Sequence, residues 1–170
     1  MARTLIVANQ TLGGDDLARL VGERVAAGQR EFYVLVPLTA VEHETDAWTG
    51  GFPVDEEDFA PIRMHATPRR ESLEEVARRR SMELDEAERR ARKRLEQMRE
   101  HIAAVGGSAD GEVSSAEPYD AVRHLLDVEE FDELVISALP ARLSRWLRMD
   151  LPSRIERVTA TPVTTVEAAE

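Results

Sequence analysis

The 170 residues are enough for one domain, and a hydrophobic content of 42% excludes an intrinsically disordered chain. The net charge of −11 excludes a general binder of phosphate backbones, so we expect no nucleic-acid partner. The absence of cysteine excludes disulfides and thiolate metal sites, and no apolar run approaches the roughly 20 residues that cross a bilayer, so we expect a cytoplasmic protein with no membrane partner.

Two short apolar runs, residues 5–8 and 32–36, open the chain. Because these runs are continuous rather than alternating with polar residues, they predict strands that are buried on both faces. Between them, apolar residues recur at helical spacing, with a glycine pair before and one glycine after. These helical residues are Leu17, Leu20, Val21 and Val25. The stretch therefore predicts a strand–helix–strand unit of a parallel sheet.

Residues 39–67 carry a glycine pair, two prolines and an acidic run, which together predict a loop insertion. Loops of this length are uncommon in compact domains unless they form lids, bind partners or are disordered. Four large apolar side chains favour a loop that folds back over the core, and a functional lid is the alternative. They belong to Trp48, Phe52, Phe59 and Met64.

A long charged helix is predicted at residues 68–105. Residues 69–100 within it hold 11 of the 22 basic residues and 9 of the 33 acidic residues of the chain. Oppositely charged residues four positions apart predict a solvated helix face, and an arginine-rich docking surface is the alternative.

This helix is too long for the domain that the rest of the chain predicts. Unbroken from Pro68 to His101, it would span about 50 Å, at ~1.5 Å per residue. A compact chain of this size is only about 40 Å across. An apolar stripe from Leu84 to Val105 should cover the sheet. Residues 68–83 should therefore project, bend or pack on another subunit.

Three further strands are predicted at residues 109–113, 133–137 and 162–166, with short helices between them around residues 122–126 and 155–158. Five strands that alternate with four helices predict a single domain over residues 1–170. Its fold class is α/β, a doubly wound five-stranded parallel sheet in the order 3-2-1-4-5 and a three-layer sandwich.

In such sheets the ligand crevice lies beyond the carboxyl ends of the strands, where the winding changes side. Asp15 and Asp16 would fall in the first turn of the first helix and would repel a phosphate there. Three arginines at three-residue spacing border the same crevice and could hold an anion, or they could neutralise nearby carboxylates. The candidate ligand-binding residues are Asn9, Gln10, Thr11, Ser137, Ala138, Arg142, Arg145 and Arg148.

Several segments resemble universal stress proteins: residues 5–8, 115–122, 135–138, 143–145 and 162–166. The resemblance covers the chain apart from residues 39–83, and it rests mainly on the order of elements and on the last third. It implies an adenine nucleotide alpha hydrolase-like or flavodoxin-like sheet and a role in stress response. It also implies a homodimer that forms through the last strand, at Val163, Thr164, Thr165 and Val166.

One branch of that family binds ATP through Gly-x-x-Gly, nine residues and Gly-Ser or Gly-Thr, with an aspartate at the end of the first strand. This sequence differs at each point: Ser137 and Pro140 replace the first two glycines, and Asn9 replaces the aspartate. With one residue deleted in the loop, Met149 and Asp150 replace the last pair. Proline has no N–H to offer a phosphate, and Asp150 should cap the following helix with its carboxylate. We therefore expect no cofactor and no ATP binding of the family kind.

No catalytic set is apparent in the sequence. Its four histidines, at positions 43, 65, 101 and 124, lack metal-ligand spacing, so no metal site is expected. We interpret the chain as a non-catalytic, universal-stress-like regulatory module that acts through an unknown protein partner or a small ligand. The alternatives are a nucleotide-binding protein whose arginines replace the glycine loop, and an enzyme that acts on a small anionic substrate in the crevice.

Overall fold

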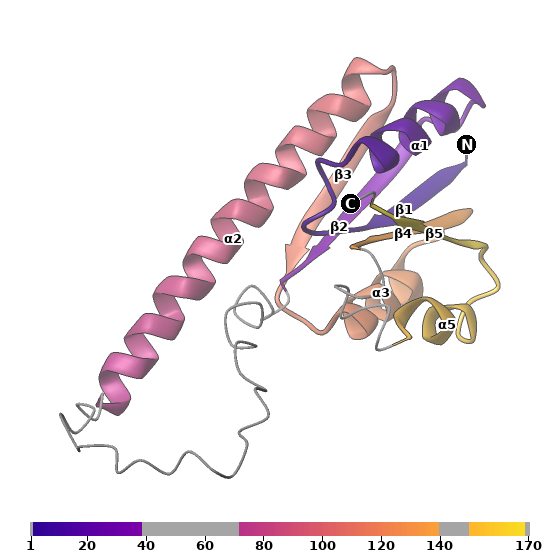
Figure 1. The fold of residues 1–170 in the computed structure, drawn as a ribbon. Coiled ribbons are helices and arrows are strands. Elements are labelled where there is room, and N and C mark those ends of the chain that lie inside the picture. The colour runs from indigo at the N-terminus through magenta and orange to yellow at the C-terminus, as the bar shows by residue number, and fades with distance from the viewer. Residues whose placement is uncertain (1, 39–71, 140–149, 169–170) are drawn as a thin grey trace, which may run out of the picture. The chain divides into compact units, whose positions relative to one another are not determined.

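The computed structural model describes residues 2–38, 72–139 and 150–168 (Figure 1). Five parallel strands form one sheet in the order β3-β2-β1-β4-β5, which confirms the predicted fold class. The strands are β1 (Arg3–Val7), β2 (Glu31–Pro37), β3 (Ser108–Ser114), β4 (Glu133–Ala138) and β5 (Val163–Glu167). The helices are α1 (Asp15–Ala26), α2 (Leu73–Ala104), α3 (Pro118–Val128) and α5 (Leu151–Glu156).

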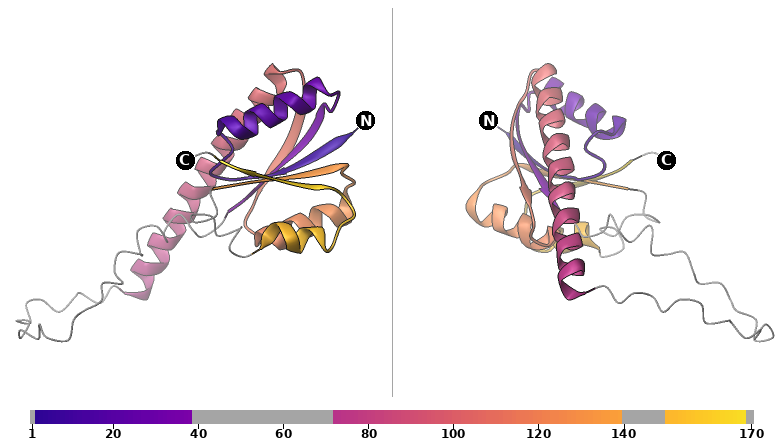
Figure 2. Two further views of the ribbon diagram at one scale, coloured as in Figure 1. Left: turned by 45° about the vertical axis from the view of Figure 1, so that its right-hand side comes forward. Right: turned by 90° about the vertical axis from the view of Figure 1, so that its left-hand side faces the viewer.

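Both faces of the sheet are covered (Figure 2). Ile6 and its neighbours on one face pack against α1 and the C-terminal half of α2. Leu5 and its neighbours on the other face pack against α3 and α5. Leu5 and Ile6 are both fully buried although they point to opposite faces, which is the reason that the central strands are continuous apolar runs.

The chain divides into two compact units, residues 1–39 with 87–170, and residues 40–86. The sheet, with α1, α3 and α5, belongs to the first unit. The loop predicted at residues 39–67 lies outside the described residues. The path of residues 68–83 stays a prediction.

The buried residues of α2 are Ala91, Leu95, Met98 and Ile102, and all four lie within the apolar stripe predicted from Leu84 to Val105. Leu84 itself belongs to the second unit, so the start of the stripe against the sheet stays a prediction.

Two glycines allow α2 and β3 to approach the rest of the sheet. Gly106 has a φ of 93°, a left-handed conformation that ends the helix at low cost. A Cβ on Gly111 would lie 2.8 Å from Leu95 Cδ1 and would also meet the backbone of Val34. The residues predicted as the third strand, 109–113, form β3 partly because Gly111 has no side chain.

Candidate functional site

Asn9 follows β1 at the carboxyl edge of the sheet, and both the nitrogen and the oxygen of its amide group form hydrogen bonds. The residue is buried, and its Nδ2 donates to the carbonyl oxygen of Pro37 at 3.0 Å. Its Oδ1 accepts a hydrogen bond from Arg94 Nη1 at 2.9 Å. The Asn9 side chain therefore links the end of β1 to β2 and α2.

Thr11 links the loop after β1 to β4, at the point in the sheet where the helices change from one face to the other. Its hydroxyl donates to the carbonyl oxygen of Ser137 at 3.0 Å. Ser137 is 1% exposed, and the carbonyl oxygen of Ala138 accepts from the amide of Ala168 at 2.9 Å. Gln10, between the two anchored residues, is exposed.

The structure brings Asn9, Thr11, Ser137 and Ala138 together, as predicted for the crevice. Asn9 and Thr11 form hydrogen bonds within this edge, to Pro37, Arg94 and Ser137. The predicted site residues Arg142, Arg145 and Arg148, and also Pro140, lie outside the described residues.

The backbone between β1 and α1 is also engaged. The amide of Leu12 donates to Asn9 at 3.2 Å, and the amide of Gly14 donates to Thr11 at 3.0 Å. Asp15 and Asp16 lie in the first turn of α1, as predicted. Donors that point into their own loop, beside two carboxylates, do not form a cradle for phosphate.

Asp150 does not cap α5 with its side chain, so that prediction is wrong. The residue is at the N-cap position, but its φ of 55° is left-handed and its carboxylate makes no capping hydrogen bond. A capping side chain needs the extended backbone that N-cap residues usually adopt. The carboxylate lies 3.9 Å from the Arg157 guanidinium instead.

Arg94 is the residue at this edge that the sequence analysis missed. In the sequence it is one of many charged residues of a long helix, and nothing in that pattern distinguishes it from its neighbours. Its position is nevertheless informative, since it lies beside the buried residues Ala91, Leu95 and Met98 of α2. An arginine next to the buried stripe of a helix can turn its head toward the sheet, and this one reaches Asn9.

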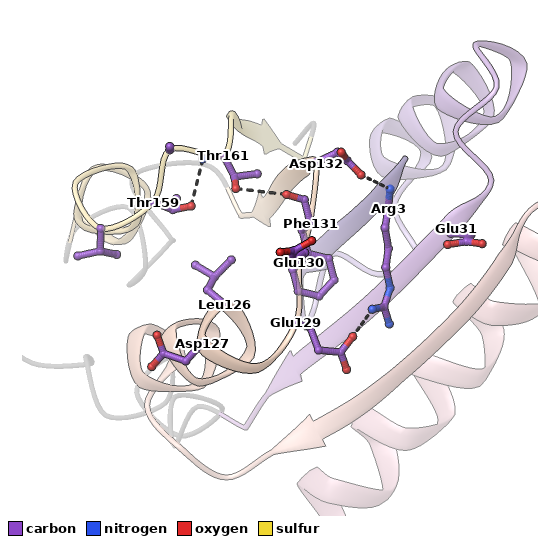
Figure 3. A pocket seen from close by; sticks show the side chains of 12 residues that line it. Arg3, Glu31, Leu126, Asp127, Glu129, Glu130, Phe131, Asp132, Thr159 and Thr161 are labelled. Atoms are coloured by element: carbon purple, nitrogen blue, oxygen red, sulfur yellow. Dashed lines mark hydrogen bonds and ion pairs between the residues drawn. The ribbon is translucent and has the colours of Figure 1, made fainter. Parts of the chain in front are cut away.

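A cavity of about 640 Å³ lies at the opposite, amino edge of the sheet (Figure 3). Five carboxylates and one guanidinium surround an apolar part, and the two threonines beside it form hydrogen bonds with neighbouring residues. The lining residues are Arg3, Glu31, Leu126, Asp127, Glu129, Glu130, Phe131, Asp132, Val158, Thr159, Ala160 and Thr161. This excess of negative charge disfavours an anionic ligand such as a nucleotide.

Arg3 forms one wall of this cavity. Its guanidinium pairs with Glu129 and lies 5.2 Å from the ring centre of Phe131 and 5.5 Å from that of Tyr33. Burial, with the negative charge of the nearby Glu112, raises the pKa of Tyr33 to about 12. The phenol therefore stays neutral at physiological pH.

Within residues 2–38, 72–139 and 150–168, no group of three histidine or carboxylate side chains could hold a metal ion. In the same part of the chain, no helix is long and apolar enough to span a bilayer.

Comparison with known proteins gives structural neighbours only. No protein-family model matches the sequence, and no curated protein matches it significantly. A universal stress protein from Archaeoglobus fulgidus is similar over 97% of this chain and 93% of its own, with a TM-score of 0.51 and 14% identity. The universal stress protein from Archaeoglobus fulgidus in complex with dAMP is similar over 97% of both chains, with a TM-score of 0.50 and 13% identity.

A third solved structure, of a hypothetical protein, covers 99% of this chain and 97% of its own, with a TM-score of 0.51 and 11% identity. Together with the strand order, these similarities give the chain the fold of universal stress proteins.

Proposed function

We propose that this protein is a non-catalytic regulatory module of the cytoplasm, with a role in stress response. It acts as a homodimer, through a protein partner or a small ligand, and it does not hold ATP in the manner of the nucleotide-binding stress proteins. The universal stress protein fold supports the general class. The finer role rests on the hydrogen bonds at the carboxyl edge of the sheet and on the difference between its outer strands, β3 and β5.

The observation that carries the proposal is the internal use of Asn9 and Thr11. A ligand in the crevice needs donors and acceptors that are free to turn toward it. Here the Asn9 amide bridges Pro37 and Arg94, and the Thr11 hydroxyl is bonded to Ser137. Opening these bonds would leave buried polar groups unpaired, which costs about 1–3 kcal/mol for each group.

The homodimer is supported by a difference between the two outer strands. On β3, Arg99 Nε donates to the carbonyl oxygen of Ala109 at 3.1 Å, and the guanidinium lies 3.8 Å from Asp110. Charged side chains of this kind discourage strand pairing between molecules. β5 lies at the other edge of the described sheet, and four of its five residues, Val163, Thr164, Thr165 and Val166, are uncharged, with Glu167 at its end.

Calorimetry with magnesium–ATP tests the proposal. A ligand at about a hundred times its dissociation constant stabilises a protein by about 2.7 kcal/mol, so a thermal-shift measurement would also detect millimolar nucleotide. We expect no heat of binding and no change in melting temperature. Saturable binding with a micromolar dissociation constant would overturn the proposal.

The second candidate is a nucleotide-binding protein, and one observation favours it: a structural neighbour was solved in complex with dAMP. The same calorimetric experiment with dAMP decides between the two. If dAMP binds, Arg145→Ala should weaken binding at least tenfold, because in this alternative the arginines bind the phosphate of the nucleotide. If dAMP does not bind, the alternative fails.

A further inference from the structure

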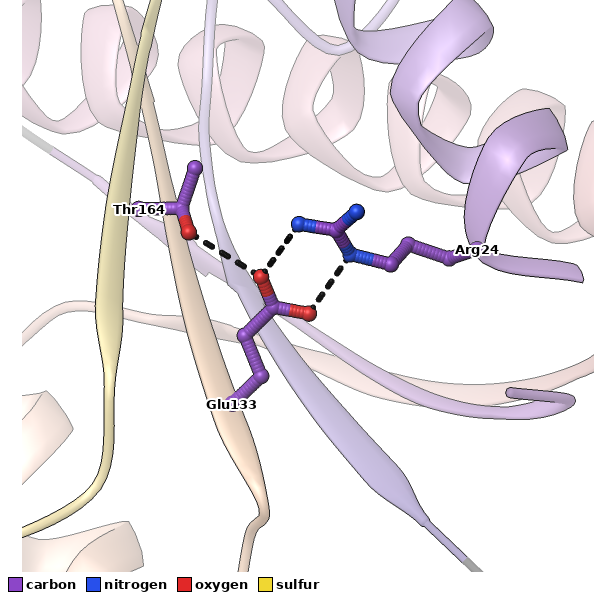
Figure 4. A network of polar contacts seen from close by, with 3 residues as sticks. All are labelled: Arg24, Glu133 and Thr164. Carbon is purple, nitrogen blue, oxygen red and sulfur yellow. Dashed lines mark hydrogen bonds and ion pairs between the residues drawn. The ribbon is translucent and has the colours of Figure 1, made fainter. Parts of the chain in front are cut away.

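A partly buried ion pair and a threonine hydroxyl join three elements on the α1 side of the sheet (Figure 4). Glu133, the first residue of β4, is 7% exposed. Arg24, in the last turn of α1, donates to both of its carboxylate oxygens, from Nε at 2.8 Å and from Nη2 at 2.7 Å. The hydroxyl of Thr164, on β5, donates to the same Oε1 at 3.0 Å.

β5 has few other anchors to the body of the protein. None of its five side chains is fully buried. Val163 and Val166 are partly buried and pack against opposite faces of the core. Among the strands that the structure describes, only β4 pairs with it, along one side. The Thr164 hydroxyl is therefore the polar link through which β5 is tied to the carboxylate that α1 holds in place.

We infer that the Arg24–Glu133–Thr164 network is a positioning device that fixes β5 in the conformation in which its free edge pairs with a second copy. The step to self-pairing rests on the proposed homodimer; the fixing of β5 does not. Arg24 holds the carboxylate in one orientation by a two-point contact, and that orientation presents Oε1 to Thr164. The hydroxyl in turn fixes the side-chain rotamer and the register of β5 against β4.

Thr164→Val tests the inference, with Thr165→Val as the matched control. Both changes replace a hydroxyl by a methyl group in the same strand and keep a β-branched side chain. Of the two threonines, only Thr164 bonds to Glu133, since the hydroxyl of Thr165 makes no hydrogen bond within the described part of the chain. The readouts are amide hydrogen exchange in β5 and the dimer dissociation constant from sedimentation.

We expect Thr164→Val to speed exchange of the β5 amides about tenfold, because a hydrogen bond to a charged group is lost. The dimer dissociation constant should rise by a similar factor. Thr165→Val should change neither by more than about twofold. Glu133→Gln is a second variant and should have at least the effect of Thr164→Val, because it removes the charge that holds Arg24.

If Thr164→Val and Glu133→Gln exchange their β5 amides no faster than Thr165→Val, the inference is overturned. Hydrogen exchange on the dilute monomer separates this result from a failure of the proposed homodimer. A wild-type chain that stays monomeric but loses β5 protection in Thr164→Val would disprove the dimer and retain the positioning role. An unchanged dissociation constant beside faster exchange would overturn the link to self-pairing.

Discussion

Glu133 is an acid whose ionised form the fold strongly prefers. The hydrogen bonds from Arg24 outweigh the cost of burial and hold the pKa of this carboxyl below its ordinary value of 4.5. A lowered pKa contributes stability that is present above the unfolded value and is lost as the pH falls through the folded one. The wild-type free energy of unfolding should therefore decline as the pH drops below about 4.5.

Glu133→Gln should remove this part of the pH dependence. At neutral pH we expect the variant to be less stable by about 2 kcal/mol, because Arg24 then keeps a half-buried charge without its counter-ion. The difference should shrink as the pH falls, since wild-type Glu133 is then protonated too. Urea unfolding of both proteins at several pH values measures it. A constant difference across the acid range would contradict the account.

Tyr33 gives a second prediction at this scale. The chain has only two tyrosines, so Tyr119→Phe leaves Tyr33 as the single phenol. Its absorbance should titrate near pH 12 rather than near the ordinary value of 10.0, because burial and Glu112 disfavour the phenolate. Since the folded pKa is raised, stability should be lost as the pH rises from 10.0 towards 12. Titration at the ordinary value in the folded protein would refute this environment.

The sequence pattern predicted the edge of the sheet where Asn9, Thr11 and Ser137 meet, because carboxyl ends of parallel strands share one edge. It did not predict that the Thr11 hydroxyl bonds to Ser137, or that the Asn9 amide group bonds to Pro37 and Arg94. Arg94 is 85 positions from Asn9, and nothing in a charged helix distinguishes an arginine that reaches the sheet. The left-handed backbone of Asp150 likewise depends on the loop around it, and residue type alone did not reveal it.

At the scale of elements, the contact between β3 and α2 depends on Gly111. Gly111→Ala should destabilise the protein by about 1–3 kcal/mol, because the new methyl group would collide with the Val34 backbone and with Leu95. The matched change is Gly22→Ala in α1, where a Cβ would meet nothing within 4 Å. That change should stabilise the protein by about 0.5–1 kcal/mol. Chemical unfolding of both variants checks the opposite signs, and equal effects would contradict the packing.

The strands were predictable because β1, β2 and β4 are continuous apolar runs, and the order followed from their alternation with helices. The buried part of α2 was harder to predict. The predicted stripe also includes Val105, which is 38% exposed just beyond the end of the helix. The helical spacing of apolar residues predicts which of them share a helix face, but the surface against which the helix packs determines how many of them are buried.

At the scale of the whole molecule, the free edge of β5 should pair two copies. The carbonyl oxygen of Pro162 and the amide of Ala168 both bond to β4. Because backbone groups alternate sides along a strand, the N–H of Thr165 points away from β4, toward the edge. Thr165→Pro removes that donor and spares the ladder to β4. We expect the dimer dissociation constant to rise at least tenfold in sedimentation experiments, whereas Thr165→Val should dimerise normally.

An unchanged dimer in Thr165→Pro would show that β5 does not form the interface. A monomeric wild-type chain at high micromolar concentration would show that no such dimer forms. The acidic cavity around Arg3 lies at the amino edge of the sheet and shares no residue with β5, so this test does not affect it.

The central claim is that the carboxyl edge is closed to nucleotides by its own hydrogen bonds. The most direct test is the amide NMR spectrum of the full chain, recorded with and without millimolar magnesium–ATP. The account predicts no shift for the amides of Gln10, Leu12, Gly14 and Ala138, because the loop stays bonded between Asn9 and Ser137. Saturable shifts at these four amides would show that the loop opens to receive the nucleotide, and would contradict the account.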